Sequence, residues 1–115
     1  LQDLGVGVQV GAHGQREGLG SHWEMWMFAQ GGMTPLEVIR AATLDGAKYI
    51  GMDKYIGSIE AGKLADLAIL DSDPTQDIYA SDQVSMVMIN GRLYDSKTMN
   101  EIGHHPKQRN KLFFQ

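Results

Sequence analysis

The stretch GSIEAGKLADLAILD, residues 57–71, decides the fold of this chain. Its first half is punctuated by glycine and contains a turn at Ala61-Gly62. Its second half, ADLAILD, is an apolar run bounded by acidic residues, and such a run predicts a short β-strand. Further along, VSMVMINGRLYD holds Asn90-Gly91 between two apolar runs, which is the strongest short-range signal for a β-hairpin. We therefore expect several strands in the second half of the chain.

The first half of the chain has a different pattern. VGVQVG, residues 6–11, predicts a short buried strand that ends at about Gly11. A glycine-rich loop follows, and after it comes the apolar helix HWEMWMFAQ, which Ser21 and Glu24 are expected to cap. The glycine pair at 31–32 is expected to end this helix.

The next helical segment has the clearest start in the chain. Thr34, Pro35 and Glu37 combine an N-cap, a first-turn proline and a capping box. Asp45 is expected to cap a further short helix, GAKYIG. The composition shifts near residue 53, so we expect a boundary there between the helices and the strands.

Composition limits the classes of function. The chain has 115 residues and a formal net charge of -4 with no basic face, so nucleic acid is not an expected partner. No apolar run approaches the roughly 18 residues of a membrane span, so a membrane is not expected either. The sequence contains no cysteine, which excludes disulfides and thiolate metal sites. The chain begins at Leu1, which we interpret as a fragment or a processed product.

His13 is the first candidate for chemistry. It follows a strand that is predicted to end at glycine, and barrel enzymes place catalytic groups at the carboxyl ends of buried strands. Imidazole can bind a divalent ion or transfer a proton near neutral pH. The alternative is a loop histidine that bonds a backbone carbonyl, and the spacing alone favours that alternative.

Other candidates are weaker. His22 and Glu24 are two positions apart and so lie on different faces of a helix, which favours a capping or supporting role. Arg16 and Glu17 could contact a substrate, or they could be a solvated loop pair. The adjacent histidines at 104–105 lie in a polar tail, where we expect no function.

Two further patterns have plain structural explanations. Trp23, Trp26 and Met27 share one side of the first predicted helix and are expected to be core residues. The aspartates between residues 66 and 77 lack the glycine and the terminal glutamate of an EF-hand loop, so they predict no calcium site.

Three segments together resemble a known family. They are GGMTPLEVIRAATLDGAKYIGM, IGSIEAGKLADLAILDSDP and VMINGRLYD, and the likeness runs over residues 5–95. They are similar to the C-terminal part of the metal-dependent amidohydrolase superfamily, in its imidazolonepropionase-like and Xaa-Pro dipeptidase-like branch. The opening VGAHGQREGLGSHWEMW and the tail after residue 96 resemble the amidohydrolases that carry a β-propeller ahead of the hydrolase domain.

The resemblance implies a fold of the α/β plus β class. Such enzymes have a (β/α)8 barrel, with metals at the carboxyl ends of its strands, and a small β-sandwich built from both chain ends. Residues 1–53 would be the end of the barrel, with its last strand, a loop and helices. Residues 54–96 would be the C-terminal share of the β-sandwich, and residues 97–115 a surface tail.

The resemblance also implies a function: metal-dependent hydrolysis of amide or peptide C–N bonds in a small substrate. The intact enzyme would hold a divalent metal, which we expect to be zinc. The family's earlier metal-binding residues would precede this segment, so the fragment alone is expected to be inactive. The family's final aspartate follows the last barrel strand, where this chain has His13. We therefore expect His13 to be the catalytic group and metal ligand here, with Glu17 and His22 contacting substrate.

The missing aspartate also supports a second interpretation. The chain could belong to a non-catalytic structural or interaction module that derives from an amidohydrolase with a degenerate site. In either case one strand with its helices cannot close a barrel, and lone sandwich strands leave unpaired edges. The expected partners are the remainder of the same protein or further copies of this chain in a homo-oligomer.

Overall fold

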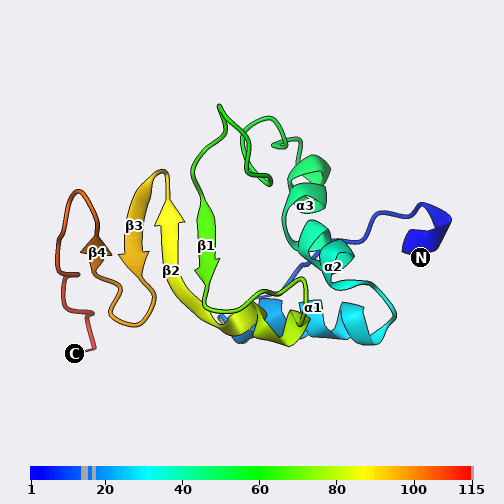
Figure 1. Ribbon diagram of the computed structural model, residues 1–115, viewed down its shortest axis with the longest axis horizontal. Helices are drawn as coiled ribbons and strands as arrows, with labels where there is room; N and C mark the ends of the chain where they lie inside the picture. Colours follow the sequence, from blue (N-terminus) through cyan, green and yellow to red (C-terminus); the bar gives the residue numbers. More distant parts are fainter. Residues whose placement is uncertain (14–15, 17, 115) are drawn as a thin grey trace.

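The computed structural model describes residues 1–13, 16 and 18–114. Figure 1 shows two parts: helices α1, α2 and α3 on one side and a sheet of strands β1 to β4 on the other. The two ends of the chain lie at opposite ends of the molecule. The elements are η1 (Gln2–Leu4), α1 (Leu19–Gln30), α2 (Pro35–Ala42), α3 (Leu44–Tyr49), β1 (Leu67–Leu70), η2 (Ile78–Asp82), β2 (Val84–Ile89), β3 (Arg92–Asp95) and β4 (Glu101–Ile102).

The start of α2 confirms the predicted capping box. The Glu37 N–H donates to Thr34 Oγ1 at 3.4 Å, and the Thr34 N–H donates to the Glu37 carboxylate at 2.7 Å. Pro35 occupies the first helical turn, where its missing N–H costs nothing. These hydrogen bonds hold the pKa of Glu37 below its ordinary value, with the Thr34 backbone bond as the largest cause.

The cap predicted for α3 is wrong. Thr43 occupies the N-cap position, and its hydroxyl donates to the Ile39 carbonyl at 2.7 Å. Asp45 lies inside the first turn and pairs with Arg40 at 3.3 Å. No side chain caps the start of α3 by a hydrogen bond, and Asp45 instead forms an ion pair with the preceding helix.

Helix α1 begins earlier than the sequence predicts. Its N-cap is Gly18, with φ +80°, so Ser21 lies inside the helix and the expected capping by Ser21 and Glu24 is wrong. The end of α1 agrees with the prediction, because Gly32 takes φ +103° directly after it. Trp23 and Met27 are 43% and 66% exposed, so within the described chain they are not core residues.

The strand predicted over residues 6–11 is also wrong. In the part of the chain that the structure describes, this segment forms no ladder with any strand. Two hydrogen bonds link this segment to the helices: the Val10 N–H donates to the Ala41 carbonyl at 3.5 Å, and the Gly11 N–H donates to the Glu24 carboxylate at 2.7 Å. A buried strand needs neighbours at its edges, and the described residues offer this segment none.

The sheet confirms the predicted hairpin. Its strand order is β1-β2-β3-β4, and every neighbouring pair is antiparallel. Asn90 and Gly91 take φ +48° and +79°, the positive values that a type I′ turn requires. The Asn90 N–H donates to the Asp66 carboxylate at 2.7 Å, and the Gly91 N–H donates to the Ala65 carbonyl at 3.1 Å. The acidic residue before β1 therefore fastens the turn between β2 and β3.

At Gly57 the signature stretch, residues 57–71, passes close to helix α3. The φ of Gly57 is +91°, and a Cβ there would lie 2.6 Å from Ala47 Cβ and 3.0 Å from Leu44 Cα. The stretch passes against α3 at a distance that only glycine allows.

The tail adds a strand to the sheet. β4 pairs with β3, and Glu101 exchanges backbone hydrogen bonds with Lys107 at 2.9 and 3.0 Å. The buried Glu101 carboxylate accepts from the Arg92 guanidinium, with Nε at 2.8 Å. Residues after 96 therefore extend the sheet, and their role as a surface tail stays a prediction.

This ion pair predicts a stability that depends on pH. Hydrogen bonding to Arg92 is the largest cause that lowers the pKa of Glu101 from 4.5 in the folded protein. The ionised carboxylate thus favours folding: its contribution is complete above pH 4.5 and is lost as the pH falls through the lower folded value. We expect the thermal midpoint to fall as the pH is lowered below 4.5, and to fall less in Glu101→Gln. Equal slopes in the two proteins would show that the pair contributes nothing.

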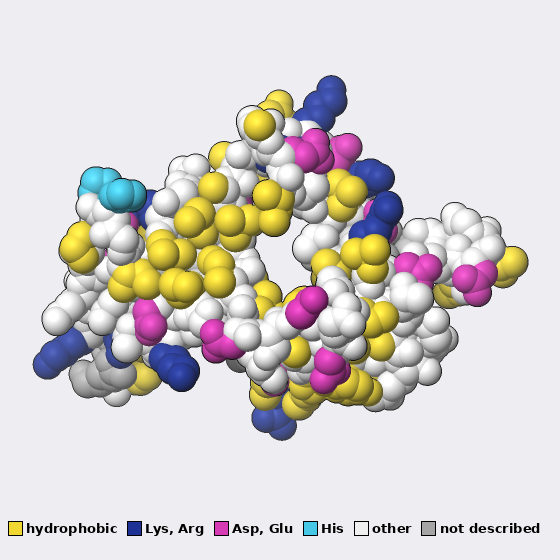
Figure 2. Space-filling view, in the orientation of Figure 1, with side chains coloured by type: hydrophobic (Ala, Val, Ile, Leu, Met, Phe, Trp, Pro, Cys, Tyr) yellow, Lys and Arg dark blue, Asp and Glu magenta, His cyan; other side chains and the backbone are white. Residues whose placement is uncertain are grey.

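The buried core of the described chain is small. Its buried hydrophobic residues are Val38, Ala41, Ala47, Ile78 and Ala80. The radius of gyration is 15.4 Å, whereas a compact domain of this length has about 13 Å. Figure 2 shows hydrophobic side chains gathered over the sheet and around a hollow between the two parts. Among the described helices none combines the length and apolar character that crossing a membrane requires.

Candidate functional site

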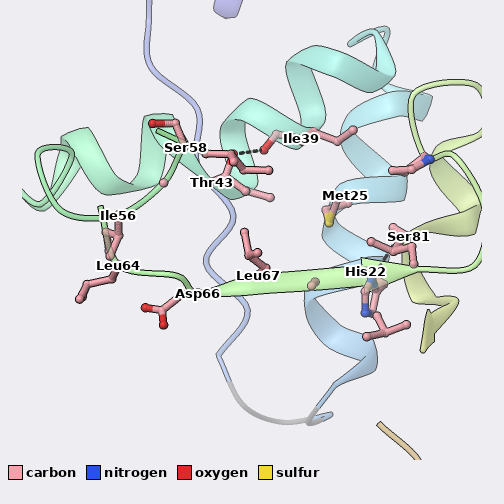
Figure 3. Close-up of a pocket in the computed structure, with 17 residues that line it drawn as sticks. His22, Met25, Ile39, Thr43, Ile56, Ser58, Leu64, Asp66, Leu67 and Ser81 are labelled. Carbon is pink, nitrogen blue, oxygen red and sulfur yellow. Dashed lines mark hydrogen bonds between the residues drawn. The ribbon is translucent and has the colours of Figure 1, made fainter. Parts of the chain in front are cut away.

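A cavity of about 470 Å³ lies between the helices and the sheet. Its walls come from α1, α2, β1 and the loop around residues 56–59, as Figure 3 shows. Most of the lining is apolar, including Met25, Ile39 and Leu67. The polar lining residues are His22, Thr43, Ser58, Asp66 and Ser81.

A partly buried hydrogen-bond network includes two of the residues that line this cavity, His22 and Ser81. The Trp26 indole N–H donates to Ser81 Oγ at 3.0 Å and to the Ile78 carbonyl at 3.1 Å. His22 Nδ1 lies 3.1 Å from the same Ser81 oxygen. An indole N–H can only donate, so the Ser81 hydroxyl oxygen accepts from Trp26, and the direction of its hydrogen bond with His22 depends on the histidine tautomer.

The network joins the helical part of the chain to the sheet. It links α1 to η2, which runs directly into β2, and Ser81 at its centre is 4% exposed. The Trp26 ring also packs at 5.4 Å from the Tyr79 ring, centroid to centroid. His22 therefore acts in this structure as a link between elements, and its contact with substrate stays a prediction.

A second network stabilises the loop at the cavity rim. The Lys63 ammonium donates to Ser58 Oγ, and the Ser58 hydroxyl donates to the Glu60 carboxylate, each at 2.5 Å. The hydrogen bond from Ser58 is the largest cause that holds the pKa of Glu60 below its ordinary value. The Lys63 and Glu60 side chains interact with each other and with Ser58, so they hold the loop at the start of the signature stretch in its conformation.

His13 lies apart from the cavity. It is exposed in the segment before α1 and is not among the residues that line the cavity. Two residues earlier, the Gly11 N–H donates to the Glu24 carboxylate of α1 at 2.7 Å. Glu17 lies outside the described residues.

The described residues do not assemble a metal centre. Among them, no group of three or more histidine, aspartate, glutamate or cysteine side chains is placed to hold a metal ion. His13 and His22 lie in different environments. His22 forms a hydrogen bond with Ser81, whereas His13 is exposed in the segment before α1.

Sequence reasoning missed the network around Ser81. Ser81 lies 59 positions from His22 and 55 from Trp26. A serine in a polar stretch has no periodic or motif signal, so only the fold reveals its partners.

A family model described as the amidohydrolase family matches residues 9–94. The chain belongs to the amidohydrolase family. The match includes His13, α1 and the whole signature stretch, and amidohydrolases are generally metal-dependent.

Individual relatives agree with this assignment. The imidazolonepropionase of Shouchella clausii (strain KSM-K16) is 47% identical over 64 residues, which cover 53% of this chain and 14% of that protein. The structure of a Xaa-Pro dipeptidase with methionine in its active site has 34% identity and a TM-score of 0.63, covering 66% of this chain and 19% of that one.

A third comparison covers nearly the whole chain. The structure of a Bifidobacterium longum protein proposed as a prolidase has a TM-score of 0.71 and 25% identity, covering 96% of this chain and 26% of that chain. These neighbours have amidohydrolase folds of the TIM-barrel type. This amidohydrolase chain spans a minor part of the length of each relative.

Proposed function

We propose that this chain is part of a metal-dependent hydrolase that acts on amide or peptide C–N bonds of a small substrate. The family match over residues 9–94 carries the proposal, because it joins the His13 segment and the signature stretch in one family. The dipeptidase neighbour supports a peptide or amide as the class of substrate.

We further propose how the chain divides within that hydrolase. Residues 1–53 would end a barrel, residues 54–96 would supply strands of a β-sandwich, and the tail would follow. The remainder of the same protein would cover the exposed apolar side chains, such as Leu19, Trp23 and Met27 on α1. The small buried core and the large radius of gyration support such a partner.

The described residues alone do not fit a metal ion, because no group of three ligands comes together among them. The imidazole of His13 can bind a metal ion, and it is exposed in the segment that the family resemblance aligns with the last barrel strand. We propose zinc for the intact protein because imidazole nitrogen is a preferred zinc ligand. The other ligands would come from outside this chain.

His13 has a second chemical capacity. A neutral imidazole can accept a proton from the water that attacks a carbonyl and later return it to the leaving amine. His13 is exposed to solvent in the described chain, so such a proton could leave it readily.

Two observations favour a different function. His13 stands where the family resemblance leads us to expect an aspartate, and the described residues contain no metal-binding group. A non-catalytic module that derives from an amidohydrolase would show the same features. The apolar surface of such a module would serve assembly.

Metal content and turnover of the intact protein distinguish the two functions. For the hydrolase we expect stoichiometric zinc, manganese or iron by elemental analysis, and release of amine from a panel of Xaa-Pro dipeptides and cyclic amides. Removing the metal with a chelator should abolish turnover, and adding it back should restore turnover. A folded protein with neither metal nor turnover would support the non-catalytic module.

A further inference from the structure

The segment that carries His13 is fastened to helix α1 by one strong hydrogen bond. The Gly11 N–H donates to the Glu24 carboxylate at 2.7 Å, across 13 positions of sequence. A hydrogen bond to an ionised carboxylate is about twice as strong as one between neutral groups. Ala12 lies against the same helix, because a Cβ at Gly20 would meet Ala12 Cβ at 3.5 Å.

Helix α1 is itself held in place on another side. Trp26, two positions beyond Glu24, donates to both Ser81 and the Ile78 carbonyl. Glu24 therefore projects from an element that is anchored to η2, and it holds a loop that has little support of its own. Among the described residues, the other hydrogen bond from residues 7–13 to the rest of the chain is the 3.5 Å bond from Val10.

We propose that Glu24 is a positioning residue for His13, and this inference rests on the proposed function. The carboxylate fixes the backbone at Gly11, and two peptide units link that point to His13. Reaction rates are sensitive to such placement, since an error of about 1 Å can cost about 100-fold in rate. Glu24 needs only an acceptor oxygen for this role, whereas a metal ligand or a general base needs the negative charge.

Two substitutions in the intact protein separate these roles. Glu24→Gln keeps an oxygen that can accept from Gly11, and Glu24→Ala removes it. We expect kcat/KM on the dipeptide and cyclic amide panel to fall by about 10- to 100-fold in Glu24→Ala. It should stay within a few-fold of the parent in Glu24→Gln. Equal loss in both variants would show that Glu24 acts through its charge and would overturn the proposal.

A double variant tests whether Glu24 acts through His13. In a His13→Ala background, Glu24→Ala should cause almost no further loss, because the residue that it positions is already gone. A full additional loss would show that Glu24 supports folding or another part of the site, and would overturn the proposal.

Amide hydrogen exchange gives a readout that does not depend on turnover. Exchange in the peptide that spans Gly11 should accelerate at least about 10-fold in Glu24→Ala and stay slow in Glu24→Gln. Unchanged exchange in Glu24→Ala would show that the hydrogen bond does not hold the segment. If exchange responds as expected while His13→Ala keeps full turnover, the hydrogen bond is confirmed and the role of His13 in the proposed function fails.

Discussion

Replacing His13 by alanine in the intact protein is expected to lower kcat/KM for amide hydrolysis by about 100- to 10,000-fold. The imidazole is the one side chain of this segment that can bind a metal or transfer a proton, and alanine can do neither. His13 is exposed, so its loss should change the free energy of unfolding by less than about 0.5 kcal/mol. Turnover and urea unfolding measured on the same preparation check both statements.

His104→Ala and His105→Ala are the matched controls. Both histidines are exposed in the turn after β4, far along the chain from the His13 segment. Each control removes one imidazole and should leave turnover at the parent level. Full activity in His13→Ala would exclude His13 from the reaction, and loss of activity in all three variants would point to a general effect of removing histidine.

Gly57→Ala is expected to cause the largest loss of stability, about 3 kcal/mol or more. Two costs combine at this position: φ is +91°, and the new Cβ would lie 2.6 Å from Ala47 Cβ. The backbone of α3 must move to relieve the contact, since Leu44 Cα would also lie at 3.0 Å. The midpoint of urea unfolding measures the change.

Gly62→Ala separates the two costs. Gly62 has nearly the same φ, +93°, but nothing lies within 4 Å of the position that its Cβ would take. This variant should lose only the cost of backbone strain, about 1–2 kcal/mol. Equal losses in the two variants would show that the contact with α3 is unimportant.

The sequence predicted best those features that depend on a few neighbouring residues. The capping box at Thr34 and the turn at Asn90-Gly91 are confirmed, because local hydrogen bonds and positive φ values determine them. The predicted start of α1 is wrong, and the cause is again local. Gly18 can take φ +80° and begin the helix, so the capping residue expected at Ser21 is not needed.

Features that depend on distant partners could not be predicted. A strand over residues 6–11 requires neighbouring strands, and the described chain supplies it with none. The apolar spacing of Trp23 and Met27 predicts core positions, but both side chains are exposed in the described chain, and the spacing carries no information about a partner that would cover them.

In the candidate site, too, features set by neighbouring residues could be predicted and features set by distant partners could not. The importance of the His13 segment follows from its place after a predicted strand end and from the family likeness. The hydrogen bond between Gly11 and Glu24 joins residues that are 13 positions apart. The hydrogen bond between His22 and Ser81 joins residues that are 59 positions apart. No sequence motif marks either pair.

The strand order of the sheet has a consequence for the sequence of folding events. Each strand pairs with the next one along the chain, so the sheet can close by successive short loops. The contact between Trp26 and Ser81 spans 55 residues and requires a much longer loop to close. Structures dominated by local contacts form faster than those that await distant ones. The four-stranded meander should therefore assemble first, and the docking of α1 onto η2 should be the slow step that completes the chain.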